Sequence, residues 1–245
     1  MDSTCTICGF PLSTVSMQEN LSIISDRGKS KTGGWLVTLN TEMLAKITHD
    51  SDYHALLKAA DMFVADGMPL VWASRRKLKQ CPQVIVERTT GVDLIDQFLR
   101  KKSIPPYAII GGNDPATTLA QYTGATDQCQ FLFSGKVDES ETQLQSFANE
   151  ISGNNIQFVF IALGTPKQDR VALALRELAP QCVYIGVGGT FEILAPGSSR
   201  APGWMQKYGL EWFYRLSKEP GRLWKRYILH YPLGIYALLK DSLTR

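Results

Sequence analysis

The stretch Phe158-Val159-Phe160-Ile161-Ala162-Leu163-Gly164-Thr165-Pro166-Lys167-Gln168 decides the fold class. Its continuous apolar run predicts a strand that is buried on both faces, and Pro166 suits the first turn of a following helix. The same order of apolar run, short polar loop and helical pattern recurs along the first 200 residues. This alternation predicts an α/β fold, Rossmann-like, with a mostly parallel sheet and helices on both faces.

The other elements follow from the same reading of the chain. The expected strands are Cys5–Leu12, Trp35–Leu39, Met62–Ala65, Tyr107–Ile110, Gln130–Phe133, Phe158–Leu163 and Cys182–Val187. The expected helices are Thr41–Thr48, Tyr53–Ala60, Pro69–Lys77, Val92–Arg100, Pro115–Tyr122, Glu139–Ile151 and Pro166–Glu177. Asp114 and Thr165 are the expected N-caps of the helices that start at Pro115 and Pro166.

The composition changes after residue 200. The whole chain of 245 residues has a net charge of +3, but residues 204–245 carry +5 and the rest carries −2. These last 42 residues also hold 9 of the 24 aromatic residues. We therefore predict a core, residues 1–200, and a basic, aromatic, helical C-terminal appendage, residues 201–245, that meets an anionic or interfacial partner.

Several classes of protein are disfavoured. Five cysteines in a long chain do not form a disulfide framework, and the start lacks the pattern of a signal peptide, so a cytoplasmic location is expected. The longest uncharged stretch near the C-terminus, Tyr227–Leu239, is too short to span a bilayer. Cys5 and Cys8 are read as strand residues, and Asp50-Ser51-Asp52 as a helix cap, so neither is expected to bind a metal.

Polar and glycine-rich loops follow five of the expected strands. They are Thr38-Leu39-Asn40, Asp66-Gly67-Met68-Pro69, Gly111-Gly112-Asn113-Asp114, Gly164-Thr165-Pro166-Lys167-Gln168 and Gly188-Gly189-Thr190. Parallel strands bring their carboxyl ends to one edge of the sheet, where ligands bind in such folds. Each loop taken alone also suits an ordinary turn or cap. Together they favour a small molecule that carries phosphate, because glycine N–H groups and helix N-termini bind anions.

Common nucleotide-binding motifs are missing from the sequence. There is no Walker A motif, and Gly186-Val187-Gly188-Gly189-Thr190-Phe191 has Phe191 at the third glycine of the dinucleotide fingerprint. A dehydrogenase is therefore disfavoured.

The loops, in this order, resemble the WecG/TagA/CpsF family of bacterial glycosyltransferases (glycosyltransferase family 26). The resemblance covers nearly the whole chain. It is carried by Thr38-x-Asn40, Asp66-Gly67, Glu87-Arg88 with Gly91 and Asp93, Gly111-Gly112, Pro166-Lys167-Gln168, Gly188-Gly189-x-Phe191, Arg200-Ala201-Pro202, Leu210-Glu211-Trp212-x-x-Arg215, Glu219-Pro220-x-Arg222 and Arg226-Tyr227.

The resemblance implies an inverting transfer of a sugar from a UDP-sugar to a polyprenyl-diphosphate-linked sugar, in the synthesis of exopolysaccharide, teichoic acid linkage units or common antigen. It also implies a peripheral position on the cytoplasmic face of the inner membrane, through the appendage. No cofactor and no metal are expected, since the UDP-sugar is a substrate. A homo-oligomer is a further expectation, and nucleic acid is not an expected partner.

Asp66 is the expected catalytic residue. An inverting transfer needs a base that takes the proton of the acceptor hydroxyl, and Asp66 stands at a strand end beside a glycine. The resemblance points to the same residue. The alternative is that Asp66 only caps the helix that starts near Pro69.

The expected substrate-binding residues are Thr38, Asn40, Arg88, Gly111, Gly112, Lys167, Gln168, Gly188, Gly189, Thr190, Arg215, Arg222 and Arg226. Asn40 or Thr41 is also a candidate helix cap, and the glycines are candidates for tight turns. Arg88 either clamps a diphosphate, orients Asp66, or forms a salt bridge with Glu87 or Asp93. Lys167 is either a ligand or an ordinary solvated lysine.

The appendage arginines supply positive charge for a leaving UDP. Arg222 and Arg226 are one helical turn apart, and Pro220-Gly221 predicts a break between helices. These arginines bind UDP, the lipid diphosphate or anionic headgroups. From Leu223 onward, apolar residues at three- and four-residue steps predict an amphipathic interfacial helix with a bend at Pro232; packing on the core is the alternative.

Two other functions remain open at this point: a non-catalytic membrane-docking protein on the same fold, and a nucleic-acid binder that uses the basic aromatic appendage.

Overall fold

The computed structural model describes residues 4–78, 86–198 and 200–243, without the side chains of Arg222 and Arg226. Its strands are β1 Thr4–Ile7, β2 Phe10–Ser13, β3 Gly34–Leu39, β4 Met62–Ala65, β5 Tyr107–Gly111, β6 Cys129–Phe133, β7 Phe158–Ala162 and β8 Val183–Gly186. The helices of the core are α1 Met17–Lys29, α2 Thr41–Ile47, α3 Ser51–Leu57, α4 Met68–Lys77, α5 Gly91–Leu99, α6 Pro115–Leu119, α7 Ala125–Gln128, α8 Glu141–Gly153, α9 Lys167–Leu178 and α10 Thr190–Leu194.

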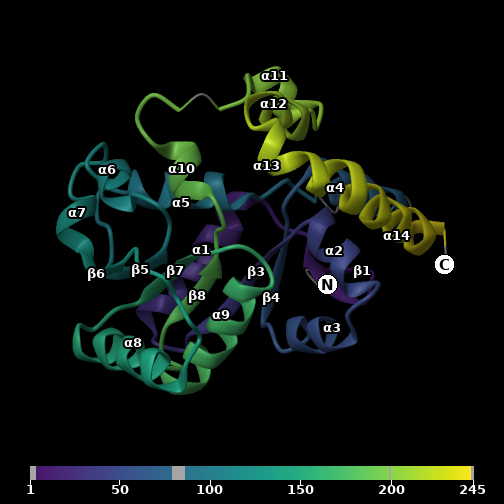
Figure 1. Cartoon of the computed structure of the whole chain (residues 1–245). Coiled ribbons are helices and arrows are strands. Elements are labelled where there is room, and N and C mark those ends of the chain that lie inside the picture. The colour runs from purple at the N-terminus through teal and green to yellow at the C-terminus, as the bar shows by residue number, and fades with distance from the viewer. Residues whose placement is uncertain (1–3, 79–85, 199, 244–245) are drawn as a thin grey trace.

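The strands form one sheet in the order β1-β2-β4-β3-β8-β7-β5-β6 (Figure 1). All neighbours are parallel except β1 and β2. Every residue of β3, β5, β7 and β8 is buried, as two covered faces require. The predicted α/β class with a mostly parallel sheet is confirmed.

Two apolar cores lie on opposite faces of the sheet. Alternate residues of β3 separate between them: Trp35, Val37 and Leu39 join one core, and Leu36 joins the other. The first core receives side chains from α2, α3, α4, α8, α9 and α14, and the second from α1, α5, α6 and α10. Burial of these apolar side chains is the main source of stability.

The predicted strand Cys5–Leu12 is wrong, because the chain turns back within it. β1 and β2 form an antiparallel hairpin in which Ile7 lies opposite Phe10. Cys8 and Gly9, the two residues of the turn, both have positive φ, at 49° and 84°. That geometry is typical of the tight turn between two hairpin strands. Cys8 is therefore a turn residue rather than a strand residue.

Helix α1 was not among the helices that the sequence predicted. It has a capping box, in which Ser16 accepts from the Glu19 N–H and Glu19 accepts from the Ser16 N–H. Glu87 also accepts a hydrogen bond of 2.8 Å from the Met17 N–H. Two predicted caps can be compared with the structure: Asp114 caps α6, but α9 begins after Pro166, and Thr165 instead bonds Asp169.

The C-terminal appendage consists of α11 Gly203–Lys207, α12 Glu211–Lys218, α13 Pro220–Lys225, a π-helical turn Arg226–His230, and α14 Tyr231–Leu243. Figure 1 shows it in yellow-green to yellow, with α14 lying along α4 and α2. A β-carbon on Gly234 would lie 2.0 Å from the Thr41 carbonyl oxygen, so the backbones of α14 and α2 touch. The break between helices predicted at Pro220-Gly221 is present, since α12 ends at Lys218 and α13 begins at Pro220. The π-helical turn ends at His230, two residues before Pro232, where a bend was predicted.

The predicted amphipathic helix has two different sides. Leu223, Tyr227 and Leu238 are buried against the protein, as the packing alternative requires, while Trp224 and Ile228 are exposed. The boundary at residue 200 between core and appendage stays a prediction.

Four charged side chains join the appendage to the core. Arg88 donates to Glu211 of α12 at 2.9 Å and pairs with Asp93 of α5 at 3.3 Å. Arg200, just before α11, pairs with Asp93 at 2.7 Å and lies 3.6 Å from Glu211. We call Arg88, Asp93, Arg200 and Glu211 the four-charge cluster. All four side chains are largely shielded from solvent, which strengthens each charge pair relative to an exposed one.

A buried carboxyl group connects two helices of the core. Asp169 of α9 is 1% exposed and accepts hydrogen bonds of 2.8 Å from both the Tyr53 and the Thr165 hydroxyls. Burial raises the pKa of Asp169 from 3.8 to about 6, against the lowering effect of those two hydrogen bonds. The folded state therefore holds this proton more tightly than the unfolded state does.

Asp169→Asn should remove a pH-dependent cost. Between about pH 4 and pH 6 the native carboxyl loses its proton later than the unfolded one, so its effect on wild-type stability becomes less favourable as the pH rises. Urea unfolding at a series of pH values should show the free energy of unfolding of the variant rising, relative to wild type, by up to about 3 kcal/mol across that window. The difference should be level above about pH 7. A difference that does not change with pH would contradict the assignment.

The four-charge cluster can be tested by a double-mutant cycle. Arg88→Ala and Glu211→Ala should show a coupling energy of about 1–2 kcal/mol in urea unfolding, because the pair is shielded and shared. The control is the i,i+4 pair Asp96 and Arg100, whose arginine is exposed. Its coupling should stay below about 0.5 kcal/mol. Equal coupling in both cycles would show that the cluster does not join the appendage to the core.

Candidate active site

Two adjoining pockets lie at the carboxyl ends of the parallel strands, between the core and the appendage. The first has a volume of about 170 Å³ and contains Asp66; we call it the Asp66 pocket. The second has a volume of about 930 Å³ and contains Asn113; we call it the Asn113 pocket. Both are lined by Asn40, Glu42, Gln168, Gly188, Gly189, Ile193, Glu211 and Arg215. The larger volume suits a ligand of nucleotide size, and the smaller one a single sugar.

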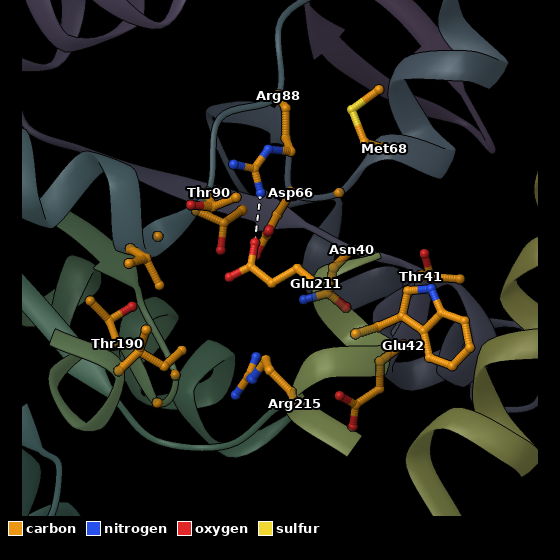
Figure 2. Close-up of a pocket in the computed structure, with 18 of the residues that line it drawn as sticks. Asn40, Thr41, Glu42, Asp66, Met68, Arg88, Thr90, Thr190, Glu211 and Arg215 are labelled. Atoms are coloured by element: carbon orange, nitrogen blue, oxygen red, sulfur yellow. Dashed lines mark hydrogen bonds and ion pairs between the residues drawn. The ribbon is translucent and has the colours of Figure 1, made fainter. Parts of the chain in front are cut away.

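Asp66 lines the smaller pocket, directly after β4 (Figure 2). Its N–H donates to the Leu39 carbonyl at 2.8 Å, which fixes the backbone beside the end of β3. The N-cap of α4 is Gly67, at φ 123°, and α4 has no side-chain cap there. Asp66 therefore stands one residue before the N-cap position, and the choice between base and cap stays a prediction. A carboxylate held at the strand end faces whatever fills the pocket.

Thr38 and Asn40 follow β3 and also line the Asp66 pocket. The Thr38 hydroxyl donates to the Gly186 carbonyl at 3.1 Å, so its proton is engaged and its lone pairs remain to accept. Asn40 caps α2 by accepting from the Met43 N–H at 3.0 Å. Asn40 is thus both a cap and a pocket residue, which leaves its side-chain NH₂ group as a donor.

The loop after β8 depends on Gln168. The Gln168 side-chain oxygen accepts from the Gly188 N–H at 3.1 Å, and a β-carbon on Gly186 would lie 2.8 Å from its Nε2 atom. Gly188 has φ 52°, which explains a glycine there. Thr190 donates to the Val187 carbonyl at 2.6 Å. The buried Gln168 therefore sets the shape of the loop and also lines both pockets.

Arg88 lines the Asp66 pocket, but its guanidinium is committed to the four-charge cluster and also donates to Gln206 at 3.3 Å. The predicted salt bridge with Asp93 is present. Two carboxylates pair with this arginine, which thereby holds α12 over the pocket, and its predicted contact with a diphosphate stays a prediction.

Three predicted ligands lie beside the pockets rather than in their linings. Lys167 donates a hydrogen bond to the Val137 carbonyl, and neither described pocket lining includes it. Gly111 and Gly112, at φ 93° and 80°, form the turn after β5 that presents Asn113 to the larger pocket. A β-carbon on Gly111 would lie 2.6 Å from the Ala162 carbonyl oxygen, so this turn requires glycine.

Arg215 of α12 lines both pockets and comes from the side opposite the core strands (Figure 2). A β-carbon on Gly189 would lie 4.0 Å from an Arg215 guanidinium nitrogen. The guanidinium and the Gly188–Gly189 loop thus face the same space, where both can donate to an anion. The predicted roles of Arg222 and Arg226 fall on side chains outside the described structure.

Acidic and aromatic lining residues were missed. Glu42 and Glu211 line both pockets, and Glu192 lines the Asn113 pocket. Glu192 accepts from the Asn113 N–H at 3.0 Å, and its other carboxylate oxygen is buried with no hydrogen-bond partner among the described residues. Their positions in the sequence could have identified two of them as lining residues, because Glu42 and Glu192 each fall within two residues of a predicted loop.

The aromatic part of the lining comes from the appendage. The rings of Tyr227 and Tyr231 lie with their centroids 5.7 and 5.9 Å from that of Trp212, and all three line the Asp66 pocket. Tyr227 and Tyr231 belong to the segment after Leu223 for which an interfacial helix was predicted, with packing on the core as the alternative. Both line the pocket, where aromatic faces suit the apolar face of a sugar ring, and the membrane contact of the helix stays a prediction.

Within residues 4–78, 86–198 and 200–243, no group of three or more His, Cys, Asp or Glu side chains has the arrangement of a metal site. Asp50 of the Asp50-Ser51-Asp52 stretch caps α3, as predicted, by accepting from the Tyr53 N–H at 2.8 Å. In the same part of the chain, none of the helices is long and apolar enough to cross a bilayer.

The comparison with known families agrees with this geometry. The model of the glycosyl transferase WecG/TagA/CpsF family matches residues 5–245, which is nearly the whole chain and includes every residue of the two pockets. The family transfers sugars in the synthesis of cell-surface polysaccharides. The chain belongs to the WecG/TagA/CpsF family of glycosyltransferases.

Proposed function

We propose that this protein transfers a hexosyl or N-acetylhexosaminyl group from a UDP-sugar to a polyprenyl-diphosphate-linked sugar, with inversion, and that Asp66 is the general base. The observation that carries the proposal is the position of Asp66 at a strand end, in a sugar-sized pocket that continues into a nucleotide-sized one. Arg215 lines both, so it can reach a diphosphate that lies between a sugar and a nucleoside.

The chemistry is a single displacement. The acceptor hydroxyl attacks the anomeric carbon of the donor, Asp66 takes the hydroxyl proton, and the bond to UDP breaks with its electron pair on the β-phosphate oxygen. Negative charge then grows on the diphosphate, and Arg215 with the N–H groups of the Gly188–Gly189 loop stabilises it. We propose that the protein needs no metal for this step, since these donors supply the positive charge.

The larger pocket suits the nucleoside. Asn113, Gly164 and Glu192 line it, so an amide and a carboxylate lie in the wall that faces the nucleoside. The acceptor sugar then occupies the other side of Asp66, beside Asn40 and the Trp212 aromatic group. Direct displacement requires the acceptor hydroxyl to approach the anomeric carbon from the face opposite UDP, with Asp66 within hydrogen-bond reach of that hydroxyl.

We further propose that the appendage holds the protein on the cytoplasmic face of the inner membrane. Its exposed apolar side chains include Trp224 of α13, Ile228 and Leu229 of the π-helical turn, and Leu239 and Leu243 of α14. The appendage carries a net charge of +5, against −2 for the rest of the chain. Aromatic and aliphatic side chains next to basic ones favour the headgroup region of anionic lipids.

The function is tested with purified protein, a detergent-solubilised polyprenyl-diphosphate sugar and a panel of UDP-sugars. UDP release and product mass are recorded. We expect acceptor-dependent turnover with one donor, unchanged by chelators. Absence of turnover with every donor and with acceptors extracted from cells would contradict the proposal and favour a non-catalytic membrane-docking role. Salt-dependent DNA binding without lipid binding would favour nucleic-acid binding instead.

Asp66→Asn should lower kcat by about 10²–10⁴-fold, because the amide cannot take the proton. UDP binding, measured by calorimetry, should change little, since the shape of the side chain is kept. The matched control is Asp114→Asn, which alters another carboxylate at a strand end that caps α6 and is not among the lining residues. The control should stay fully active. Full activity of Asp66→Asn would exclude the base role.

A further inference from the structure

A half-exposed tryptophan of the core lies at the rim of the Asp66 pocket. Trp72 of α4 is 51% exposed, although the residues before and after it in the helix, Val71 and Ala73, are buried. Met68, one helical turn before it, lines the Asp66 pocket. Four residues of helix span about 6 Å along the axis. The backbone of Trp72 therefore lies about one helical turn from that of the lining residue Met68.

The appendage meets this rim at Gly209, which also lines the pocket. A β-carbon on Gly209 would lie 2.9 Å from the Met68 β-carbon and 3.2 Å from the Cη2 atom of Trp72. The appendage backbone therefore lies directly on these two side chains. Gly209 has φ 70°, so glycine also suits the turn.

The residues on either side of Gly209 add to the apolar surface. Tyr208 is 64% exposed and Leu210 is 36% exposed. We call Met68, Trp72, Tyr208 and Leu210 the rim surface. Met68 lines the pocket, Trp72 follows one helical turn later, and Tyr208 and Leu210 flank the appendage turn that lies on both side chains. An exposed apolar surface that is continuous with a binding pocket indicates an apolar part of the same ligand.

We propose that the rim surface binds the isoprene units that follow the first one in the lipid-linked acceptor, so that the chain leaves the Asp66 pocket between α4 and the turn at Gly209. This inference rests on the proposed function, which supplies a ligand with a sugar, a diphosphate and a prenyl chain in that order. With the sugar beside Asp66, Met68 and then Trp72 offer the apolar chain a path out of the pocket.

The aromatic ring of Trp72 suits this role. It offers a large, rigid apolar face at low cost in side-chain entropy, and its N–H can stay in water. Branched isoprene units lie well on such a face.

The test measures binding rather than transfer. Calorimetry in detergent gives the affinity of the full-length protein for two prenyl diphosphates, one with a single isoprene unit and one with a long chain. Wild type should bind the long chain more tightly. Trp72→Ala should weaken long-chain binding about tenfold and leave short-chain binding unchanged, because apolar contact area alone is lost. Trp72→Phe should keep most of the preference.

The matched control is Trp204→Ala, which removes another exposed tryptophan (60%) that is not among the lining residues of either pocket. Its preference for the long chain should equal that of wild type. A preference that survives Trp72→Ala would overturn the proposal. An equal loss of affinity for both chain lengths in Trp72→Ala would also overturn it. So would a Trp72→Ala variant that binds both prenyl diphosphates like wild type but no longer binds acceptor-free anionic vesicles, because the rim would then be a bilayer contact. If prenyl binding behaves as expected but no sugar is transferred, the proposed function fails and the rim assignment stands.

Discussion

The four-charge cluster is the interaction on which the rest of the site depends. The core brings Asp66, Asn40 and the Gly188–Gly189 loop to one edge of the sheet, but Arg215 and Trp212 reach that edge from α12. Arg88 and Arg200 hold α12 there through Glu211, and Asp93 balances both arginines. A shielded group of two carboxylates and two guanidinium groups is stable only when all four are present. Removing one leaves a shielded charge without its partner, which lowers the stability of the fold.

This constraint explains why the charges of the pocket have different functions. Arg88 is paired with two carboxylates and fixes the position of α12, while Arg215 faces the glycine loop and is, in the proposed function, the counterion of the diphosphate. The pocket is therefore assembled from two parts of the chain that are far apart in sequence. In the proposed function, donor sugar, acceptor sugar and nucleoside are brought together only while the appendage is in place. The exposed side chains of Trp224 and Ile228 are among those that we propose to contact a membrane.

Sequence reasoning was most accurate where a single physical cause acts. The strand at Met62–Ala65 was predicted with its observed bounds, because a buried parallel strand needs a continuous apolar run. It failed at Cys8-Gly9, where backbone φ rather than hydrophobicity decides the turn. Helix α1 has a weakly apolar face, but its capping box at Ser16 and Glu19 was readable. The five loops at strand ends were found because parallel topology alone brings them together.

The partners of individual side chains could not be read in the same way. Lys167 stands next to Gln168 in sequence, yet one bonds the Val137 carbonyl and the other shapes the loop at Gly188. The direction of a side chain at the start of a helix depends on the element packed against it. The spacing of residues in the sequence does not reveal that neighbour. Glu211 was quoted for its motif and not as a lining residue, because its contact with Arg88 spans 123 positions of sequence.

The central claim is a single displacement assisted by one base, and the configuration of the product tests it most directly. NMR of the transferred sugar gives the anomeric configuration through its one-bond C1–H1 coupling. The account predicts a configuration opposite to that of the UDP-sugar, because the acceptor hydroxyl activated by Asp66 attacks from the face opposite UDP. A retained configuration would contradict it, since retention requires either a covalent intermediate or attack from the same face.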